Sequence, residues 1–170
     1  GSIPEEMPTF LHQLAIAGYE TVLCGRMHFE GLDQRHGFTK RIAYDVTPTT
    51  IGCGQSPIRK QMGMLSGEPY ALQIVGGGNN HVHHYDDYVV QAALDYLAQP
   101  HEKPQCIVVG IYCPHSPYIG EKELYEYYLD KVEMPPHNAP VHPVEAAGRL
   151  TEQDPEVLRA LRAAYYANTE

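Results

Sequence analysis

CIVVGIY, at residues 106–112, is an almost uninterrupted apolar run, and it decides the fold. A run of this length without alternating polar residues is typical of a central strand in a parallel sheet. A helical pattern precedes it. Asp86 and Asp87 form a plausible N-cap, and the apolar residues of 88–97 recur at helical spacing before Pro100. This order predicts a helix that leads into a buried parallel strand.

The N-terminal part of the chain repeats the same organisation. Apolar residues fall at helical spacing over residues 4–17, and Gly18 stands where a helix would end. The β-favouring run YETVLC follows at 19–24 and is closed by Gly25. Helices that alternate with buried strands predict an α/β fold with a mainly parallel sheet flanked by helices.

The rest of the chain shows weaker patterns. Residues 26–80 are rich in Gly, Pro, Thr and Gln, which predicts long loops with short strands at 41–46 and 70–75. The last third predicts helices at 121–129 and 155–167, with a Pro- and His-bearing loop at 134–143.

Length and charge set the class of protein. The 170 residues are 43% hydrophobic, enough for one sizeable core, so we expect a single domain over 1–170. The formal net charge of -9 argues against nucleic acid as a partner, because phosphate binding depends on clustered Lys and Arg. No apolar run is long enough to cross a bilayer, so we expect a soluble chain with no membrane partner. The cytoplasm is slightly favoured over export, although the sequence leaves the compartment open.

The four cysteines give no sign of a metal or redox motif. Cys24, Cys53, Cys106 and Cys113 show no CxxC spacing, and most of them lie in or beside apolar runs. We expect them to be reduced and structural.

Arg26 and His28 directly follow the first predicted strand. They stand two residues apart in a loop, and both side chains can turn toward one point. A guanidinium presents a fork of donors that matches sulfate or phosphate oxygens, and an imidazole can bind an anion or transfer a proton. An equally plausible interpretation is structural, with Arg26 paired to a carboxylate such as Asp33 and His28 bonded to a backbone carbonyl.

His115 follows the 106–112 strand and lies between Pro114 and Pro117. The prolines fix the backbone, so the imidazole would have a defined direction and would suit a proton donor to a leaving oxygen. The structural alternative is a turn histidine satisfied by neighbouring backbone. Parallel strands present their carboxyl ends at one edge, where ligands gather, so we expect residues 25–28 and 114–118 to share that edge.

Two other clusters invite a chemical interpretation. His81, His83 and His84, with Asp86 and Asp87 behind them, have the composition of a transition-metal site but poor spacing for one, so we expect solvated loop histidines. The run GGG at 76–78 lacks the Lys-Ser/Thr of a phosphate-binding loop, and we expect a flexible turn there.

Taken together, the motifs resemble the sulfatase family of the alkaline-phosphatase-like superfamily. That family shows, in order, Ala-Gly-Tyr-x-Thr, Gly-Lys-x-His, His-Gly-Phe, Pro-His-x-Pro-Tyr and an Ala-Tyr-Tyr-Ala helix. The matching segments are PTFL at 8–11, AGYET at 17–21, GRMHF at 25–29, HGF at 36–38, CPHSPY at 113–118 and RAAYYA at 162–167. Residues 33–38 together with GRMHF look nearest to choline-sulfatase-like and arylsulfatase-type bacterial members.

The resemblance implies a partial sulfatase fold, with this chain as an internal fragment of a larger catalytic domain and residues 47–80 as a variable loop. It implies cleavage of a sulfate monoester, with Arg26, His28 and His115 as the catalytic and substrate-binding residues. The family has Lys where this chain has Arg26. That change keeps the charge and alters the geometry, so contact with the sulfate is favoured over proton transfer by this residue.

In such enzymes a formylglycine, made from a cysteine in Cys-x-Pro/Ala-Ser-Arg, attacks the sulfate beside a calcium ion. Cys53 and Cys113 stand in segments that lack this pattern, so we reject both as the nucleophile. Calcium and formylglycine are therefore expected in the full-length enzyme and not on this chain, which should hold no metal and be inactive alone.

The expected partners are a small-molecule sulfate ester and the missing N- and C-terminal parts of the same protein. Two alternatives stay open: a phosphodiesterase or phosphonate monoester hydrolase of the same superfamily, and a non-catalytic α/β binding module. The identity of the sulfated substrate and the oligomeric state are not encoded in recognisable motifs.

Overall fold

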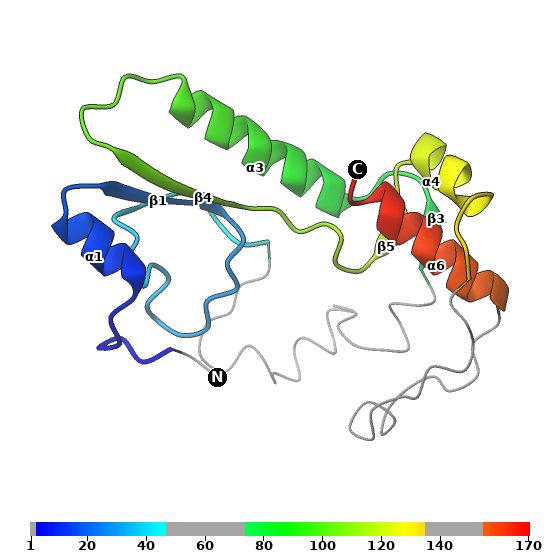
Figure 1. The fold of residues 1–170 in the computed structure, drawn as a ribbon, viewed down its shortest axis with the longest axis horizontal. Helices are drawn as coiled ribbons and strands as arrows, with labels where there is room; N and C mark the ends of the chain where they lie inside the picture. Colours follow the sequence, from blue (N-terminus) through cyan, green and yellow to red (C-terminus); the bar gives the residue numbers. More distant parts are fainter. Residues whose placement is uncertain (1–2, 47–73, 135–154) are drawn as a thin grey trace. The chain divides into compact units, whose positions relative to one another are not determined.

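A computed structural model describes residues 3–46, 74–134 and 155–170 (Figure 1). The chain divides into two compact units. The first comprises residues 1–64 and 81–112, and the second comprises residues 65–80 and 113–170. The expected single domain over 1–170 stays a prediction.

The first unit contains a parallel sheet of three strands in the order β2-β1-β4. The central strand β1 (Glu20–Gly25) pairs in parallel with β2 (Lys40–Ala43) and with β4 (Gln105–Gly110). The pairing with β4 is unbroken, from Glu20 opposite Gln105 to Gly25 opposite Gly110. The predicted α/β fold with a parallel sheet is confirmed.

Helices cover both faces of this sheet (Figure 1). Because side chains alternate along a strand, Leu23 packs with Leu11 of α1 (Phe10–Ile16), whereas Cys24 packs with Val89 of α3 (His81–Leu97). Leu23 and Cys24 are fully buried. A buried Leu or Val side chain contributes roughly 1.5–3 kcal/mol, so the two faces of β1 are the core of the unit.

The helix predicted from residue 4 begins only at Phe10. Pro8 explains the difference, because the residue before a proline is disfavoured in helical conformation. Thr9 is the N-cap, and its backbone N–H donates to Nδ1 of His12 across 3.0 Å. The His12 side chain therefore caps the backbone N–H at the start of α1.

The second predicted helix is real but starts earlier than expected. α3 begins at His81, so the proposed N-cap at Asp86 and Asp87 is wrong and the expected loop histidines lie in its first turn. Asn80 precedes the helix and is a residue type favoured at N-caps. The Asp86 carboxylate serves the tertiary fold instead, because it accepts a hydrogen bond from the backbone N–H of Tyr112 at 2.6 Å.

β4 matches the predicted strand in position but not in environment. Within the described residues it ends the strand order, and the side chain of Val109 is 44% exposed. Ile111, directly beyond the strand, is 47% exposed. The expectation of a central strand is therefore not met by the part of the chain that the structure describes.

The second unit joins a short parallel pair of strands to two helices. β3 (Val75–Gly77) pairs with β5 (Tyr118–Gly120), beside α4 (Lys122–Leu129) and α6 (Pro155–Ala167). Both helices were predicted, whereas β5 was not, because three residues give too short a pattern. α6 buries Ala163, Ala164 and Ala167, whereas Tyr165 is exposed.

The glycine run at 76–78 is not a flexible turn. Gly76 and Gly77 belong to β3, and a Cβ at Gly77 would lie 2.8 Å from the ring of Tyr125. The run thus allows α4 to approach the strand closely. No helix in the described ranges is long and apolar enough to cross a membrane. Three subjects of prediction lie outside those ranges: most of the strand at 70–75, the segment around Cys53, and most of the loop at 134–143.

Replacing Gly25 by Ala should strongly destabilise the first unit. Gly25 has a φ of 91°, and a Cβ there would lie 2.3 Å from the carbonyl oxygen of Gly110 and 2.7 Å from Val89. The strained conformation and the overpacking together should lower the free energy of unfolding by about 2–4 kcal/mol. Urea denaturation followed by circular dichroism measures this change.

Gly18→Ala is the matched control for this substitution. Gly18 has a similar φ of 93°, but a Cβ there would meet nothing within 4 Å. Gly18→Ala should therefore lower the free energy of unfolding only through the strained backbone conformation, by about 1 kcal/mol. Equal losses in the two variants would show that the approach of β1 to Gly110 and Val89 is not a tight constraint.

Candidate functional site

The site is built at the carboxyl edge of the three-stranded sheet. β1 and β4 end side by side, and the backbone N–H of Arg26 donates to the carbonyl of Gly110 at 2.7 Å. The residues that follow β1, β2 and β4 therefore meet at one edge, where parallel sheets bind ligands. Arg26 and His28 come from the first of these ends, Asp45 from the second and Tyr112 from the third.

Arg26 and His28 contact each other directly. Nη2 of Arg26 lies 2.7 Å from Nδ1 of His28. A guanidinium can only donate, so Nδ1 must accept, and the ring proton of a neutral His28 must then be on Nε2. In this arrangement His28 offers an N–H donor from Nε2, which suits an anion and does not suit a base.

Asp45 contacts both members of this pair. Its Oδ2 accepts a hydrogen bond from the backbone N–H of His28 at 2.8 Å, and its Oδ1 lies 3.8 Å from Nε of Arg26. The structural alternative named Asp33 as the partner of Arg26, and the partner is Asp45 instead. His28 bonds to Arg26 through its ring rather than to a backbone carbonyl.

Tyr112 supports the guanidinium from the end of β4. The Arg26 guanidinium carbon lies 4.6 Å from the centroid of the Tyr112 ring, a cation–π contact. The backbone of Tyr112 is held by the Asp86 carboxylate. The Arg26 side chain is only 19% exposed, so its charge is weakly screened by solvent. The site is thus a small, preorganised cluster of donors.

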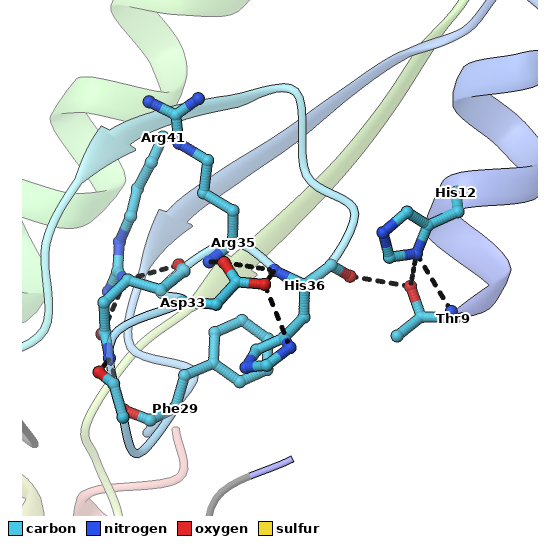
Figure 2. A network of polar contacts seen from close by, with 9 residues as sticks. Thr9, His12, Phe29, Asp33, Arg35, His36 and Arg41 are labelled. Carbon is cyan, nitrogen blue, oxygen red and sulfur yellow. Dashed lines mark hydrogen bonds and ion pairs between the residues drawn. The ribbon is translucent and has the colours of Figure 1, made fainter. Parts of the chain in front are cut away.

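The loop after His28 is fixed by a second polar network (Figure 2). The Asp33 carboxylate accepts hydrogen bonds from the backbone N–H groups of Arg35, at 2.8 Å, and His36, at 3.2 Å. His36 is 2% exposed and packs edge-on against Phe29, with ring centroids 4.6 Å apart. The carbonyl of His36 accepts a hydrogen bond from the Thr9 hydroxyl at 2.7 Å, which ties the loop to the start of α1.

Arg41 of β2 joins this loop to the strand ends. Its guanidinium donates to the carbonyl of Gln34 at 3.0 Å and to the carbonyl of Gly25 at 3.2 Å. One cation therefore satisfies carbonyl oxygens from two segments. Arg41 is occupied with the protein's own backbone, which distinguishes it from Arg26.

The pKa of Tyr85, on α3, is affected by the charged residues of the site. Its hydroxyl donates to the carbonyl of Tyr44 at 2.9 Å. Burial, followed by the nearby carboxylates of Asp45 and Asp86, raises the pKa of Tyr85 to about 12. The negative field of the Asp45 and Asp86 carboxylates thus reaches the half-buried hydroxyl of Tyr85.

His115 belongs to the second unit, in the segment before β5. Its Nδ1 lies 3.0 Å from the carbonyl oxygen of Ser116 and 3.2 Å from the Ser116 hydroxyl. A carbonyl can only accept, so in that contact Nδ1 carries a proton, and Nε2 is the second ring nitrogen. The expectation that His115 completes the pair of Arg26 and His28 stays a prediction.

The described residues do not fit the metal or the nucleophile that the resemblance implies. They contain no group of three or more His, Cys, Asp or Glu side chains placed to hold a metal ion. Cys24, Cys106 and Cys113 are not in disulfide bonds, and burial raises the pKa of the Cys24 thiol, which opposes nucleophilic reactivity. Cys53 lies outside the described residues.

Sequence reasoning missed Asp45, Tyr112 and Asp86 as parts of the site. Asp45 stands in the predicted strand at 41–46 and Tyr112 ends the 106–112 run, so their places after parallel strands were a usable signal. Asp86 gave no such signal, because it acts from within a helix.

Asp33 predicts how stability depends on pH. Partial burial raises the pKa of its carboxyl, but the N–H groups of Arg35 and His36 and the nearby imidazoles outweigh burial and lower it below 3.8. A depressed pKa in the folded state stabilises the protein above the ordinary Asp value, and this contribution disappears as the pH falls below it. Asp33→Asn should cost about 1 kcal/mol at pH 7 and progressively less below pH 4.

Urea denaturation at pH 7 and at pH 3 measures this difference. Asp95→Asn is the control, because Asp95 lies on α3 and bonds to Gln91 within the same helix. A cost of Asp33→Asn that is the same at both pH values would contradict the role given to the Asp33 carboxylate.

Comparison with known proteins agrees with the motifs. No model of a known protein family matches the chain. The choline-sulfatase of Rhizobium meliloti (strain 1021) is 31% identical to it over 173 aligned positions, which cover 95% of this chain. The chain spans about a third of that protein's length, 32%. This match, together with the parallel α/β fold, shows that the chain is related to the sulfatase family.

Proposed function

We propose that the full-length protein to which this chain belongs is a sulfuric ester hydrolase that cleaves a sulfate monoester. The observation that carries the proposal is the Arg26–His28 pair at the carboxyl edge of the sheet, in a chain related to a choline-sulfatase. The pair is a set of donors held in place before any ligand arrives, which is what recognition of an anion requires.

Arg26 supplies the positive charge of the sulfate contact. Its guanidinium is backed by the Tyr112 ring, its Nε lies 3.8 Å from the Asp45 carboxylate and its Nη2 donates to His28, so Nη1 and the second hydrogen of Nη2 would serve the ligand. A planar fork of donors matches two oxygens of a tetrahedral anion. A sulfate ester carries its negative charge on such oxygens, so the guanidinium would stabilise the charge of the bound ester.

His28 adds a second donor from the same loop. Because Nδ1 accepts from Arg26, the proton on Nε2 is directed to the other side of the ring. His28 would hydrogen-bond a sulfate oxygen and would stabilise charge that develops on it during reaction. We therefore assign it to binding of the transition state rather than to proton abstraction.

We assign proton donation to His115. Hydrolysis of a sulfate monoester breaks the bond between sulfur and the ester oxygen, and the alcohol that leaves must gain a proton. Nε2 of a protonated His115 would supply it, while Nδ1 stays bonded to Ser116. A new sulfur–oxygen bond to the nucleophile forms as the ester bond breaks, and overall the oxygen of one water ends on sulfate while one of its protons restores the imidazolium.

Calcium and formylglycine would supply charge neutralisation and the nucleophile in a sulfatase. The described residues of this chain do not fit either group, so the roles assigned to Arg26, His28 and His115 depend on neither. We propose that the chain contributes one wall of the sulfate pocket, that the remaining groups come from other parts of the same protein, and that the isolated chain is inactive.

His115→Ala in the full-length protein should lower kcat on an aryl sulfate by about 100- to 10,000-fold, the usual contribution of a general acid. The loss should be smaller on esters with a very acidic leaving group, because such an alcohol departs without a proton. Steady-state kinetics on two aryl sulfates that differ in leaving-group pKa measures both effects.

His84→Ala provides the control for this substitution, since His84 is exposed on α3. It should turn over both esters as the wild type does. Unchanged turnover in His115→Ala would overturn the role of His115. Wild-type activity on phosphodiesters or phosphonate monoesters, with none on sulfate esters, would replace the proposed reaction by that alternative.

A further inference from the structure

We propose that Asp45 is a positioning residue of this site, which fixes both the backbone of His28 and the guanidinium of Arg26. The proposal rests on the function proposed above, because positioning matters only if the pair binds the substrate. Asp45 itself is not assigned a contact with the substrate. It acts through the two residues that are.

The first observation is the backbone of His28. His28 has a φ of 55°, in the left-handed region that residues other than glycine rarely adopt. Its N–H donates to Oδ2 of Asp45 at 2.8 Å, and hydrogen bonds to a charged acceptor are stronger than neutral ones. The carboxylate of Asp45 thus stabilises a conformation that the chain would otherwise leave.

The second observation is the environment of the Arg26 guanidinium. Its Nε is buried, and no group in the described part of the chain accepts a hydrogen bond from it. Oδ1 of Asp45 lies 3.8 Å away and provides the compensating negative charge. Since the Asp45 side chain is only 6% exposed, solvent screens this ion pair weakly. Removing the side chain would leave the Arg26 guanidinium without this partner and free to turn away from His28.

The third observation is that the two oxygens of the Asp45 carboxylate contact different residues of the pair. Oδ2 holds His28 and Oδ1 faces Arg26, so the distance between the two residues is set by a rigid group. Two further carboxylates in the described part of the first unit bind backbone at other segments, Asp33 at residues 35 and 36 and Asp86 at residue 112. Strained backbone held by a buried charge is characteristic of functional sites.

Two substitutions at Asp45 separate its tasks. Asp45→Ala removes both the acceptor and the charge, and it should lower kcat of the full-length enzyme by about 10- to 100-fold, as expected for a lost charged hydrogen bond. Asp45→Asn keeps an acceptor for His28 and should recover kcat to within about 10-fold of wild type. It also removes a negative charge beside the anion pocket, so the inhibition constant of inorganic sulfate should stay unchanged or fall.

Asp33→Ala is the matched control, because it removes a carboxylate that holds backbone in the same unit. It should lower the melting temperature while keeping kcat within about 3-fold of wild type. A purely structural role for Asp45 predicts the same behaviour in Asp45→Ala. Wild-type kcat and wild-type sulfate inhibition in a folded Asp45→Ala protein would therefore overturn the proposal, as would an equal loss of kcat in Asp33→Ala.

Failure of the proposed function would look different. In that case the wild type itself would not hydrolyse sulfate esters, whatever the variants do. The positioning role is then measured by calorimetric binding of inorganic sulfate, where affinity should be highest in wild type and Asp45→Asn and lowest in Asp45→Ala. Equal sulfate affinity in all three proteins would reject it. If Asp45→Ala does not fold, a kcat more than 100-fold below wild type in a folded Asp45→Asn would likewise reject the proposed rescue.

Discussion

The unbroken parallel pairing of β1 with β4 is the constraint on which the first unit depends. It places Gly25 opposite Gly110, where only residues without side chains allow the backbones to meet. The next hydrogen bond, from Arg26 to Gly110, extends the pairing past the end of the strands. The chain then leaves both strands at the same level, so Tyr112 lies under the guanidinium of Arg26. A shift by one residue would turn these side chains to opposite faces.

Carboxylates organise this edge of the sheet although the chain as a whole is acidic. Asp45 and Asp86 each accept a hydrogen bond from the backbone of a residue that follows a strand, His28 after β1 and Tyr112 after β4. Their charges are directed inward to N–H groups, and the donors of Arg26 and His28 remain for a ligand. A net charge of -9 therefore does not prevent an anion site, because the sign of a local field depends on where the charges are directed.

Much of the fold was readable from local patterns, and the failures have identifiable causes. The strands around Val22 and Ile107 and the helix at 155–167 follow directly from apolar runs and periodicity. The start of α3 was misplaced because Asp86, a good N-cap residue type, is used for a contact with Tyr112 far along the chain. The pairing of Arg26 with Asp45 rather than Asp33 was likewise set by a strand neighbour, which sequence proximity does not reveal.

The left-handed backbone at His28 also limits which residues evolution or mutagenesis can place there. Glycine, asparagine and aspartate tolerate this conformation, whereas valine, isoleucine and threonine would strain it. Among the tolerated residues, only asparagine retains a side-chain N–H donor. Few residue types can therefore replace His28, because the backbone geometry restricts the choice as well as the chemistry. Loss of activity in a β-branched variant would say little about the imidazole, and asparagine is the informative replacement.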